Sequence, residues 1–310
     1  MMIPLHVIIS GASSGIGLAL ARDLAASGHR LYVCARRANA LEELATEHAS
    51  IAVRPCDVSD EGQVLQFIDW VKRQTTYADA LLNCAGILAP IGAVARTDSE
   101  EWWHTLRVNL FGTYLMIKHA LPLLEGSSIP RIINFAGGGA FNPFPNYSAY
   151  ACSKAAVVRL TECLAEELAG RGICVNALAP GFVATPIHLA TLEAGPERAR
   201  QEQYDVTVKG LESGLSAQTA IECVRFLLSD SAAGLTGKSI SANFDPWREP
   251  YFSSQISEIN RSDLLTLRRV APWVKPAAGL SEIIERLERM RVSTPASGNA
   301  GGDDRESGPP

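Results

Sequence analysis

Short apolar runs rich in β-branched residues alternate along the chain with longer segments whose apolar residues recur at helical spacing. The short runs predict buried strands, and the longer segments predict amphipathic helices. Strands that alternate with helices are typical of a parallel sheet covered on both faces. We therefore predict an α/β fold, a doubly wound sheet of about seven strands whose ligand lies along their carboxyl ends. The apolar runs lie at residues 5–9, 31–34, 51–54, 80–83, 131–135, 173–178 and 239–244.

The order of these patterns divides the chain into one large domain and a C-terminal extension. A chain of 310 residues is long enough for one large α/β domain, which we place at residues 1–247. Within it, residues 184–215 combine proline, glycine and charge and predict mobile helices that form a lid. Residues 248–292 predict a helical extension, and residues 293–310, rich in Ser, Gly, Pro and Asp, predict a disordered tail. The main helical patterns are Glu100–Leu124, Tyr150–Ala169, Ser262–Arg269 and Ser281–Met290.

The first apolar run, Val7–Ile9, leads directly into a glycine-rich turn and then into the helical pattern Leu18–Ala26. A strand, a glycine turn and a helix in this order are typical of a dinucleotide site. The first glycine permits the tight turn, the second lets backbone approach a pyrophosphate, and the third lets the helix pack closely on the sheet. The phosphates would meet the amino end of the helix, whose free N–H groups attract anions. The alternative is a plain tight turn. The glycines are Gly11, Gly15 and Gly17.

Two arginines, Arg36 and Arg37, follow the second predicted strand. A cofactor with a free ribose hydroxyl usually meets an acidic residue at this point, whereas arginine accommodates a 2′-phosphate. No acidic residue occurs between Arg30 and Asn39. The sequence therefore predicts NADP(H) in preference to NAD(H). The alternative is a pair of solvated surface arginines.

Tyr150 and Lys154 are four residues apart in a helical pattern, which places both side chains on one face. A nearby ammonium favours the phenolate, so we expect the tyrosine pKa to fall below its reference value of about 10. A phenol with a lowered pKa can exchange a proton with an alcohol or a carbonyl. Taken alone, the pair is more typical of an ordinary helix with both side chains exposed, and only the accompanying motifs favour catalysis.

These motifs occur in the order found in one family, and from Ile3 to Trp247 the chain resembles a classical short-chain dehydrogenase/reductase. The resemblance also rests on Cys56-Asp57-Val58, Leu82-Asn83-Cys84-Ala85-Gly86, Val108-Asn109 and Asn176–Thr185. It implies a Rossmann fold and catalytic roles for Tyr150, Lys154 and Asn109. Lys154 would also hold the nicotinamide ribose, and Asn109 would anchor a water relay toward the lysine. The segment around Asn83 would stabilise the central sheet. The expected cofactor-binding residues are Gly11, Ser13, Ser14, Gly15, Ile16, Gly17, Arg36, Arg37, Asp57, Val58, Asn83, Ala85, Gly86, Tyr150, Lys154, Pro180, Gly181, Val183 and Thr185.

One segment departs from the family pattern. The family normally carries Ile-x-Asn-x-Ser-Ser before the tyrosine, and its second serine donates a hydrogen bond to the substrate oxygen. Ala136 and Gly137 stand at the two serine positions here. Losing one preorganised donor typically costs about a hundred- to a thousandfold in rate. Three explanations stay open. Another hydroxyl, Tyr147 or Ser148, substitutes for the serine; the substrate or a water polarises the carbonyl; or the site has left ordinary ketone reduction.

The glycine run that replaces the serines leaves backbone N–H groups uncovered, so a bulky or anionic substrate group can approach closely. We therefore take Gly137 and Gly138 as candidate substrate contacts, together with Ser148 ahead of the tyrosine and His188 after the proline-glycine loop. The alternatives are a merely flexible loop for the glycines and a surface position on the lid for the histidine.

Composition and charge limit the partners. The chain is 47% hydrophobic and 20% charged, as in ordinary globular proteins, and its net charge of −5 predicts neither nucleic acid nor an anionic membrane as partner. No apolar stretch approaches the roughly twenty residues that span a bilayer, and the start of the chain does not resemble a secretion signal. The seven cysteines form no Cys-x-x-Cys pair, which suits reduced thiols in the cytoplasm, and the six histidines show no metal-ligand spacing. The resemblance implies a homodimer or homotetramer built by the two long helices.

We therefore predict an NADP(H)-dependent oxidoreductase that transfers a hydride between nicotinamide and a carbonyl or alcohol carbon of a small polar substrate, such as a carbohydrate or a secondary metabolite. Two alternatives from other classes stay open. One is a redox-neutral epimerase, dehydratase or cyclase on the same scaffold, which the missing serine motivates. The other is a non-catalytic NADP-binding regulator. The joint presence of Asn109, Tyr150 and Lys154 argues against the regulator, because a binding module needs no tuned phenol.

Overall fold

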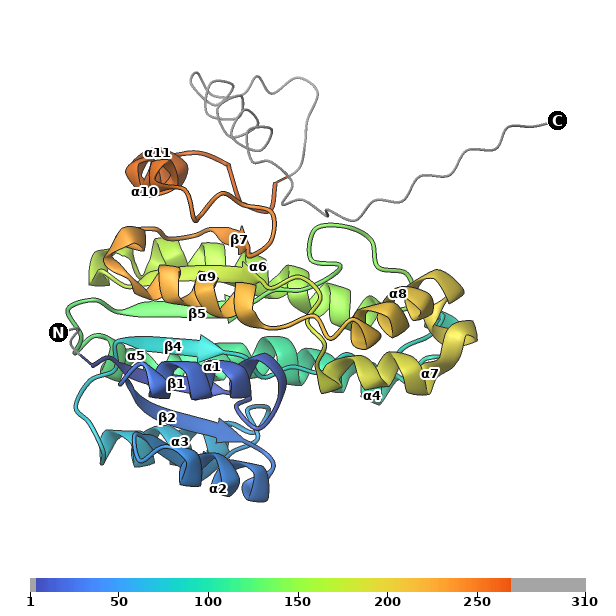
Figure 1. Cartoon of the computed structure of the whole chain (residues 1–310), viewed down its shortest axis with the longest axis horizontal. Helices are drawn as coiled ribbons and strands as arrows, with labels where there is room; N and C mark the ends of the chain where they lie inside the picture. Colours follow the sequence, from blue (N-terminus) through green and yellow to red (C-terminus); the bar gives the residue numbers. More distant parts are fainter. Residues whose placement is uncertain (1–3, 269–310) are drawn as a thin grey trace, which may run out of the picture. The chain divides into compact units, whose positions relative to one another are not determined.

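Seven parallel strands form one sheet in the computed structural model, which describes residues 4–268 (Figure 1). Their order across the sheet is β3-β2-β1-β4-β5-β6-β7, so the winding reverses between β1 and β4. A doubly wound sheet opens a crevice at this switch point, outside the carboxyl ends of the strands. The predicted fold class is confirmed. The strands are β1 (His6–Ser10), β2 (Arg30–Ala35), β3 (Ile51–Pro55), β4 (Ala80–Asn83), β5 (Arg131–Phe135), β6 (Cys174–Ala179) and β7 (Ser239–Ser241).

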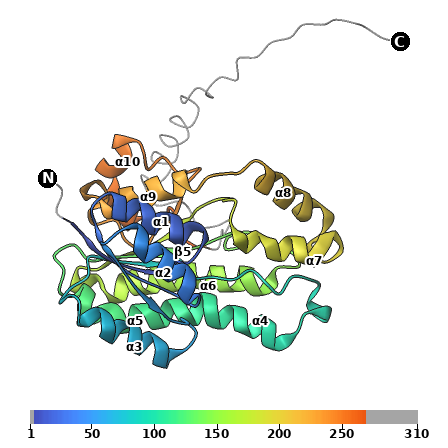
Figure 2. The ribbon, with the colours of Figure 1, turned by 60° about the horizontal axis from the view of Figure 1, so that its bottom comes forward.

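Helices cover both faces of the sheet and bury two apolar cores (Figure 2). Along β1, Val7 and Ile9 belong to the first core and Ile8 to the second, because successive strand side chains point to opposite faces. No helix within residues 4–268 is long and apolar enough to cross a membrane. The first core is closed by α1 (Gly15–Ala26), α2 (Ala38–Glu47) and α9 (Gln218–Leu228), and the second by α3 (Glu61–Lys72), α5 (Gly112–Leu124) and α6 (Ser148–Glu167).

The predicted helix Glu100–Leu124 is present, but it is not uniform. A π-helical turn, Arg107–Phe111, separates α4 (Ser99–Leu106) from α5. Asn109 lies in the middle of this turn and is fully buried. Single π-helical turns inside α-helices are frequent at functional sites.

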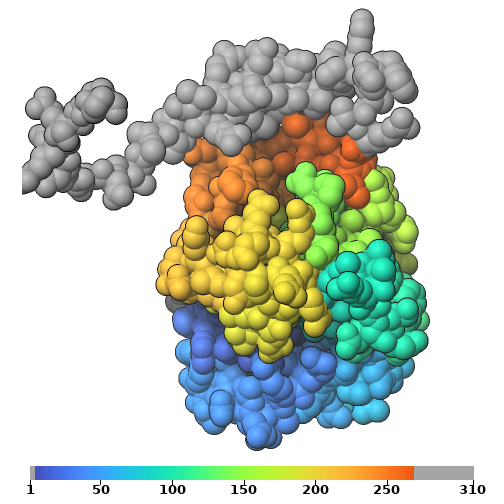
Figure 3. Space-filling view, turned by 90° about the vertical axis from the view of Figure 1, so that its right-hand side faces the viewer, coloured from blue at the N-terminus to red at the C-terminus, as the bar shows by residue number. Residues whose placement is uncertain are grey.

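The predicted lid lies over the carboxyl edge of the sheet. Figure 3 looks onto this edge and shows the lid in yellow, between the blue amino-terminal segments and the orange carboxyl-terminal ones. Arg198 Nε donates to the Ile91 carbonyl at 3.0 Å, and Asn146 Nδ2 donates to the Arg198 carbonyl at 2.7 Å. These bonds fasten the lid to two loops at the same edge. Its helices are α7 (Leu189–Ala199) and α8 (Gln201–Glu212).

The chain continues past the last strand and packs back onto the sheet. Phe252, Ile256 and Ile259 are buried in the same apolar core as α1 and α9. The Ser239 N–H of β7 donates to the Leu265 carbonyl at 2.8 Å, so the continuation also lies along the outer edge of the sheet. The described residues, 4–268, thus belong to one compact unit. The helices of this continuation are α10 (Pro250–Ser254) and α11 (Ile256–Arg261).

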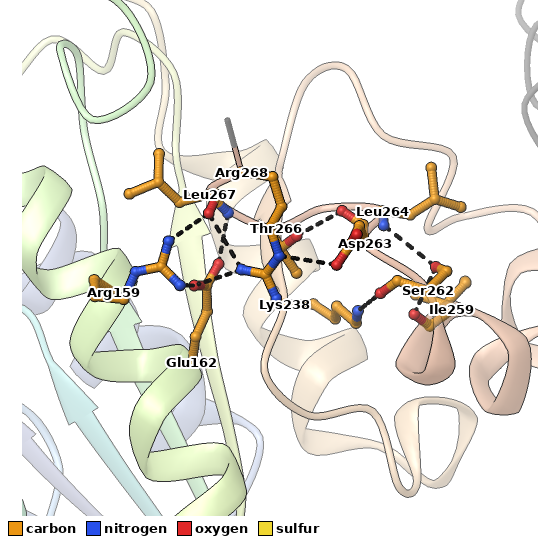
Figure 4. A network of polar contacts seen from close by, with 10 residues as sticks. All are labelled: Arg159, Glu162, Lys238, Ile259, Ser262, Asp263, Leu264, Thr266, Leu267 and Arg268. Atoms are coloured by element: carbon orange, nitrogen blue, oxygen red, sulfur yellow. Dashed lines mark hydrogen bonds and ion pairs between the residues drawn. The ribbon is translucent and has the colours of Figure 1, made fainter. Parts of the chain in front are cut away.

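The predicted helix Ser262–Arg269 is wrong over its described part, because none of residues 262–268 is helical. Contacts with α6 hold this segment instead (Figure 4). Glu162 of α6 is buried, accepts from the Leu267 N–H at 2.5 Å, and pairs with Arg268 at 3.3 Å. Tertiary contacts therefore override the amphipathic pattern. Three predictions lie outside the described residues: residues 269–292 of the extension, the helix Ser281–Met290 and the tail 293–310.

Candidate active site

The glycine turn between β1 and α1 packs closely on the backbone just after β4. A Cβ at Gly11 would lie 2.6 Å from the Ala85 backbone, and one at Gly17 would lie 2.5 Å from the Gly11 carbonyl. Neither position can carry a side chain in this geometry. Ser14 precedes α1 and makes no side-chain cap bond, which suits a helix end that receives an anion.

A pocket of about 640 Å³ runs from this turn along the carboxyl edge of the sheet. Its volume lies within the range of small-molecule and cofactor sites. The glycine cradle, the two arginines and Thr185, which lies beside Gly15, fit a nicotinamide dinucleotide. The predicted cofactor residues that line it are Gly11, Ser13, Ser14, Gly15, Ile16, Gly17, Arg36, Arg37, Asp57, Val58, Ala85, Gly86 and Thr185.

The arginines lie at the end where the adenosine ribose is expected. Arg37 donates through Nη2 to the Ser13 carbonyl at 3.2 Å and to Ser13 Oγ at 3.1 Å. Arg36 lines the same pocket and is exposed. The two guanidiniums therefore lie directly after β2 and beside the glycine turn, as the order of the motifs along the chain predicted.

Tyr150 and Lys154 lie on one face of α6 at the carboxyl end of β5. Lys154 is 5% exposed, and its Nζ donates to the Phe135 carbonyl at 2.7 Å. The same Nζ lies 5.7 Å from the centre of the Tyr150 ring and 3.6 Å from the position of a Cβ at Gly86. Because Gly86 lines the pocket, the ammonium lies directly behind the pocket wall.

Burial sets the pKa of both groups. It raises the pKa of Tyr150 to about 12 and lowers the pKa of Lys154 to about 8. The predicted lowering of the tyrosine pKa is wrong for this geometry, because the lysine donates to Phe135 and leaves desolvation as the main influence on the phenol. The phenol is therefore protonated at neutral pH and is suited to donate a proton.

Asn109 connects the pocket wall to the catalytic helix. Its Oδ1 accepts from the Ile87 N–H at 2.8 Å, and its Nδ2 donates to the Ile87 carbonyl and to Ser153 Oγ, each at 2.9 Å. Ile87 lines the pocket, and Ser153 precedes Lys154 on α6. Asn109 thus fixes the distance between the pocket wall at Ile87 and α6. The water relay from Asn109 toward Lys154 stays a prediction.

Six predicted cofactor residues do not line the pocket: Asn83, Tyr150, Lys154, Pro180, Gly181 and Val183. Asn83 is buried, and its Nδ2 donates to Asn134 Oδ1 on the neighbouring strand at 2.9 Å. Asn134 in turn donates to Thr161 of α6 at 2.9 Å. This chain of bonds ties β4, β5 and the catalytic helix together.

Two predicted substrate residues are engaged elsewhere. Ser148 Oγ accepts from Trp102 Nε1 at 3.0 Å. The His188 ring stacks on Phe182 with centroids 4.1 Å apart, and burial lowers the pKa of His188. Neither side chain lines the pocket.

No sequence motif singled out the residues at the far end of the pocket. Its lining includes Leu88, Ala89 and His104, together with Ile187, Leu189, Ala190 and Glu193. The last four of these residues lie within the predicted lid, residues 184–215. That range was the only feature of the sequence that pointed to this end of the pocket. Within the described residues, no three His, Cys, Asp or Glu side chains are grouped as metal ligands.

Comparison with known proteins agrees with this geometry. Residues 5–194 match the family described as short chain dehydrogenase. A 2-(R)-hydroxypropyl-CoM dehydrogenase of Xanthobacter autotrophicus is 35% identical over 243 residues, which cover 75% of this chain and 94% of that protein. An actinorhodin polyketide ketoreductase solved with NADPH is 29% identical at a TM-score of 0.70, over 77% of this chain and 95% of that one. Levodione reductase is 28% identical at a TM-score of 0.68, over 76% and 95%. The chain therefore belongs to the short-chain dehydrogenase/reductase family of oxidoreductases.

Proposed function

We propose that this enzyme is an NADP(H)-dependent oxidoreductase that interconverts a ketone and a secondary alcohol. The observation that carries the proposal is the placement of a buried ammonium, Lys154, directly behind the wall of a dinucleotide-sized pocket, with the ring of the protonated Tyr150 phenol 5.7 Å from it. A polyketide ketoreductase and levodione reductase, both similar in structure, support a ketone as the reacting group.

Each residue has a distinct part in the proposed reaction. When bound, the cofactor supplies or accepts the hydride at the carbonyl carbon. Tyr150 donates the proton to the carbonyl oxygen in reduction and accepts it in oxidation. Lys154 holds the nicotinamide ribose, and its Nζ lies 5.7 Å from the centre of the Tyr150 ring. Asn109 keeps the pocket wall at its fixed distance from α6.

The lining of the far end favours a substrate with an apolar body. Leu88, Ala89, Ile187, Leu189 and Ala190 contribute aliphatic side chains to this part of the lining, beside His104 and Glu193. A sugar would meet two polar side chains in this lining, His104 and Glu193, and each further buried hydroxyl left unpaired would cost about 1–3 kcal/mol. We therefore propose a compact apolar ketone or alcohol in preference to the carbohydrate considered from the sequence.

The test is turnover of the purified enzyme with NADPH and matched carbonyl compounds, followed by loss of the reduced-nicotinamide absorbance. We expect cyclic or aryl ketones to be reduced and aldohexoses to react much more slowly. Product formation without net cofactor consumption would contradict the proposal and favour the redox-neutral class. Tight NADPH binding without turnover of any compound would favour the regulator.

The cofactor preference predicts a specific loss of affinity. Replacing both Arg36 and Arg37 with alanine should weaken NADPH binding about 10- to 100-fold, because charge-assisted bonds to a phosphate are lost. NADH binding should change by less than about threefold, since its ribose has no phosphate. Fluorescence titration with both nucleotides measures the two constants. Arg30→Ala is the matched control, because Arg30 begins β2 at the opposite end. Equal losses for NADH and NADPH would contradict the assignment.

We propose further that two copies associate through the two long helices that the family resemblance implies, α4 with α5 and α6, and that α4 and α5 carry the apolar contacts. Trp103, Phe111 and Tyr114 are exposed along these helices, and the rings of the last two lie 6.0 Å apart. Phe111→Glu should raise the dissociation constant of the oligomer about a hundredfold, because it places a charge at an apolar interface. Light scattering over a concentration series measures this. Val206→Glu, at an exposed position of α8, is the control. An unchanged mass for Phe111→Glu contradicts this face.

A reducing compartment suits the cysteines. All seven are unpaired, and Cys34, Cys56 and Cys223 are buried in the cores. We therefore propose the cytoplasm as the location of the enzyme.

A further inference from the structure

The glycine run before α6 packs directly against the catalytic tyrosine. A Cβ at Gly137 would lie 2.3 Å from the Tyr150 hydroxyl oxygen and 3.0 Å from its Cζ. Contacts shorter than 3.0 Å essentially never occur for a real Cβ, so something must shift if one is added. The phenol hydroxyl therefore occupies the space that a side chain at position 137 would need.

The three glycines of this run are not equivalent. Gly139 has a φ of +82°, and a Cβ there would lie 2.7 Å from Ala151 Cβ. At Gly138 the nearest atom, Phe144 Cε1, would be at an ordinary contact distance of 3.6 Å. Packing against the start of α6 thus requires glycine at 137 and 139 but not at 138, so the run is more than a flexible loop.

The end of β5 fixes both catalytic side chains. The Phe135 carbonyl accepts from Lys154 Nζ at 2.7 Å. Two residues further on, the bare Cα of Gly137 faces the Tyr150 hydroxyl. The backbone of residues 135–137 therefore sets the position of the phenol relative to the ammonium.

The neighbouring hydroxyls do not replace the family's serine. Tyr147 is fully buried and donates to Thr191 Oγ1 at 3.2 Å. Ser148 accepts from Trp102 at 3.0 Å. Both side chains are bound to other elements and neither lines the pocket, whereas the phenol of Tyr150 lies against the backbone of residue 137.

We propose that Gly137 is a positioning residue that holds the Tyr150 phenol at the end of β5. Tyr150 then donates to the substrate oxygen without help from a hydroxyl at position 137. The inference rests on the proposed reductase function. It predicts that a serine at position 137 does not add a second donor but displaces the first. A misplacement of about 1 Å can cost about a hundredfold in rate.

A thermal unfolding cycle tests the contact without any activity assay. Gly137→Ala should lower Tm by about 2–8 °C, because it overpacks the phenol. In the Tyr150→Phe background the same substitution should lower Tm by no more than about half as much, since the nearest atom is absent. Gly138→Ala is the matched control and should change Tm by less than about 1 °C in both backgrounds. A double variant that folds where Gly137→Ala alone does not would also support the contact.

Kinetics separate positioning from packing. With NADPH and a ketone, Gly137→Ser should lower kcat about a hundredfold, while KM and the NADPH dissociation constant change by less than about threefold. Gly170→Ala, where nothing lies within 4 Å of the added Cβ, controls for the assay. Equal Tm losses in both backgrounds, or a kcat for Gly137→Ser at or above that of the wild type, overturn the proposal. Wild-type turnover by Tyr150→Phe would instead refute the proton role in the proposed function, and the unfolding cycle would still decide the contact.

Discussion

Tyr150→Phe is expected to lower turnover about a hundred- to ten-thousandfold, the range that a positioned general acid contributes. The substitution removes only the hydroxyl that would carry the proton. The cofactor pocket is lined by other residues, so the NADPH dissociation constant should change by less than about threefold. Steady-state kinetics with a ketone and fluorescence titration with NADPH measure the two quantities.

The control for this substitution is Tyr77→Phe. Tyr77 packs on His6, at the amino end of β1 and thus at the opposite edge of the sheet, with ring centroids 4.7 Å apart. Its turnover should equal that of the wild type. If Tyr150→Phe also keeps wild-type turnover, the phenol is not the proton donor.

Lys154→Met is expected to abolish turnover and to stabilise the fold at neutral pH. A lysine pKa of about 8 in place of 10.5 means that keeping the charge buried costs roughly 3 kcal/mol. Loss of the bond to the Phe135 carbonyl returns about 1 kcal/mol of that gain. The net gain of about 2 kcal/mol corresponds to a rise in Tm of about 4–8 °C.

The pH dependence of the free energy of unfolding is a second consequence of the buried Lys154 charge. Below about pH 8 the lysine is charged in both the folded and the unfolded state, so the full cost is present. Between about pH 8 and 10.5 the unfolded state binds more protons, so the contribution of Lys154 to the free energy of unfolding rises with pH. Lys154→Met should remove this rise, and Lys154→Arg, which keeps a charge, should not stabilise the fold. Denaturant titrations at pH 7 and 10 decide the matter. A less stable Lys154→Met at pH 7 contradicts the buried-charge argument.

Sequence alone predicted the fold and the phosphate end of the pocket because local sterics decide both. A Cβ added at Gly11 or Gly17 would meet neighbouring backbone at under 3 Å, so neither position has room for a side chain. The arginines follow β2 directly, so chain order places them. Features of this kind depend on neighbours in sequence and on the order of the strands.

The catalytic end depends on contacts between distant segments, and there the sequence was less informative. The spacing of Tyr150 and Lys154 predicted their common face, but it could not show that Phe135 takes the ammonium. His104 and Glu193 come to the far end of the pocket only because α4 and the lid meet there. The amphipathic pattern after residue 261 was misleading for the same reason, because contacts with α6 decide that segment.

The anchoring of the carboxyl-terminal segment on Glu162 has a practical consequence for exchanging parts between relatives. The resemblance to the family ends near Trp247, which makes that residue an obvious junction for a chimera. However, Glu162 lies two turns beyond Lys154 on the same helix, and Leu267 and Arg268 are its partners. A junction at residue 247 would transfer α6 without Leu267 and Arg268, the residues that bind its Glu162. The junction of a chimera should therefore follow Arg268, so that α6 and residues 262–268 come from the same parent.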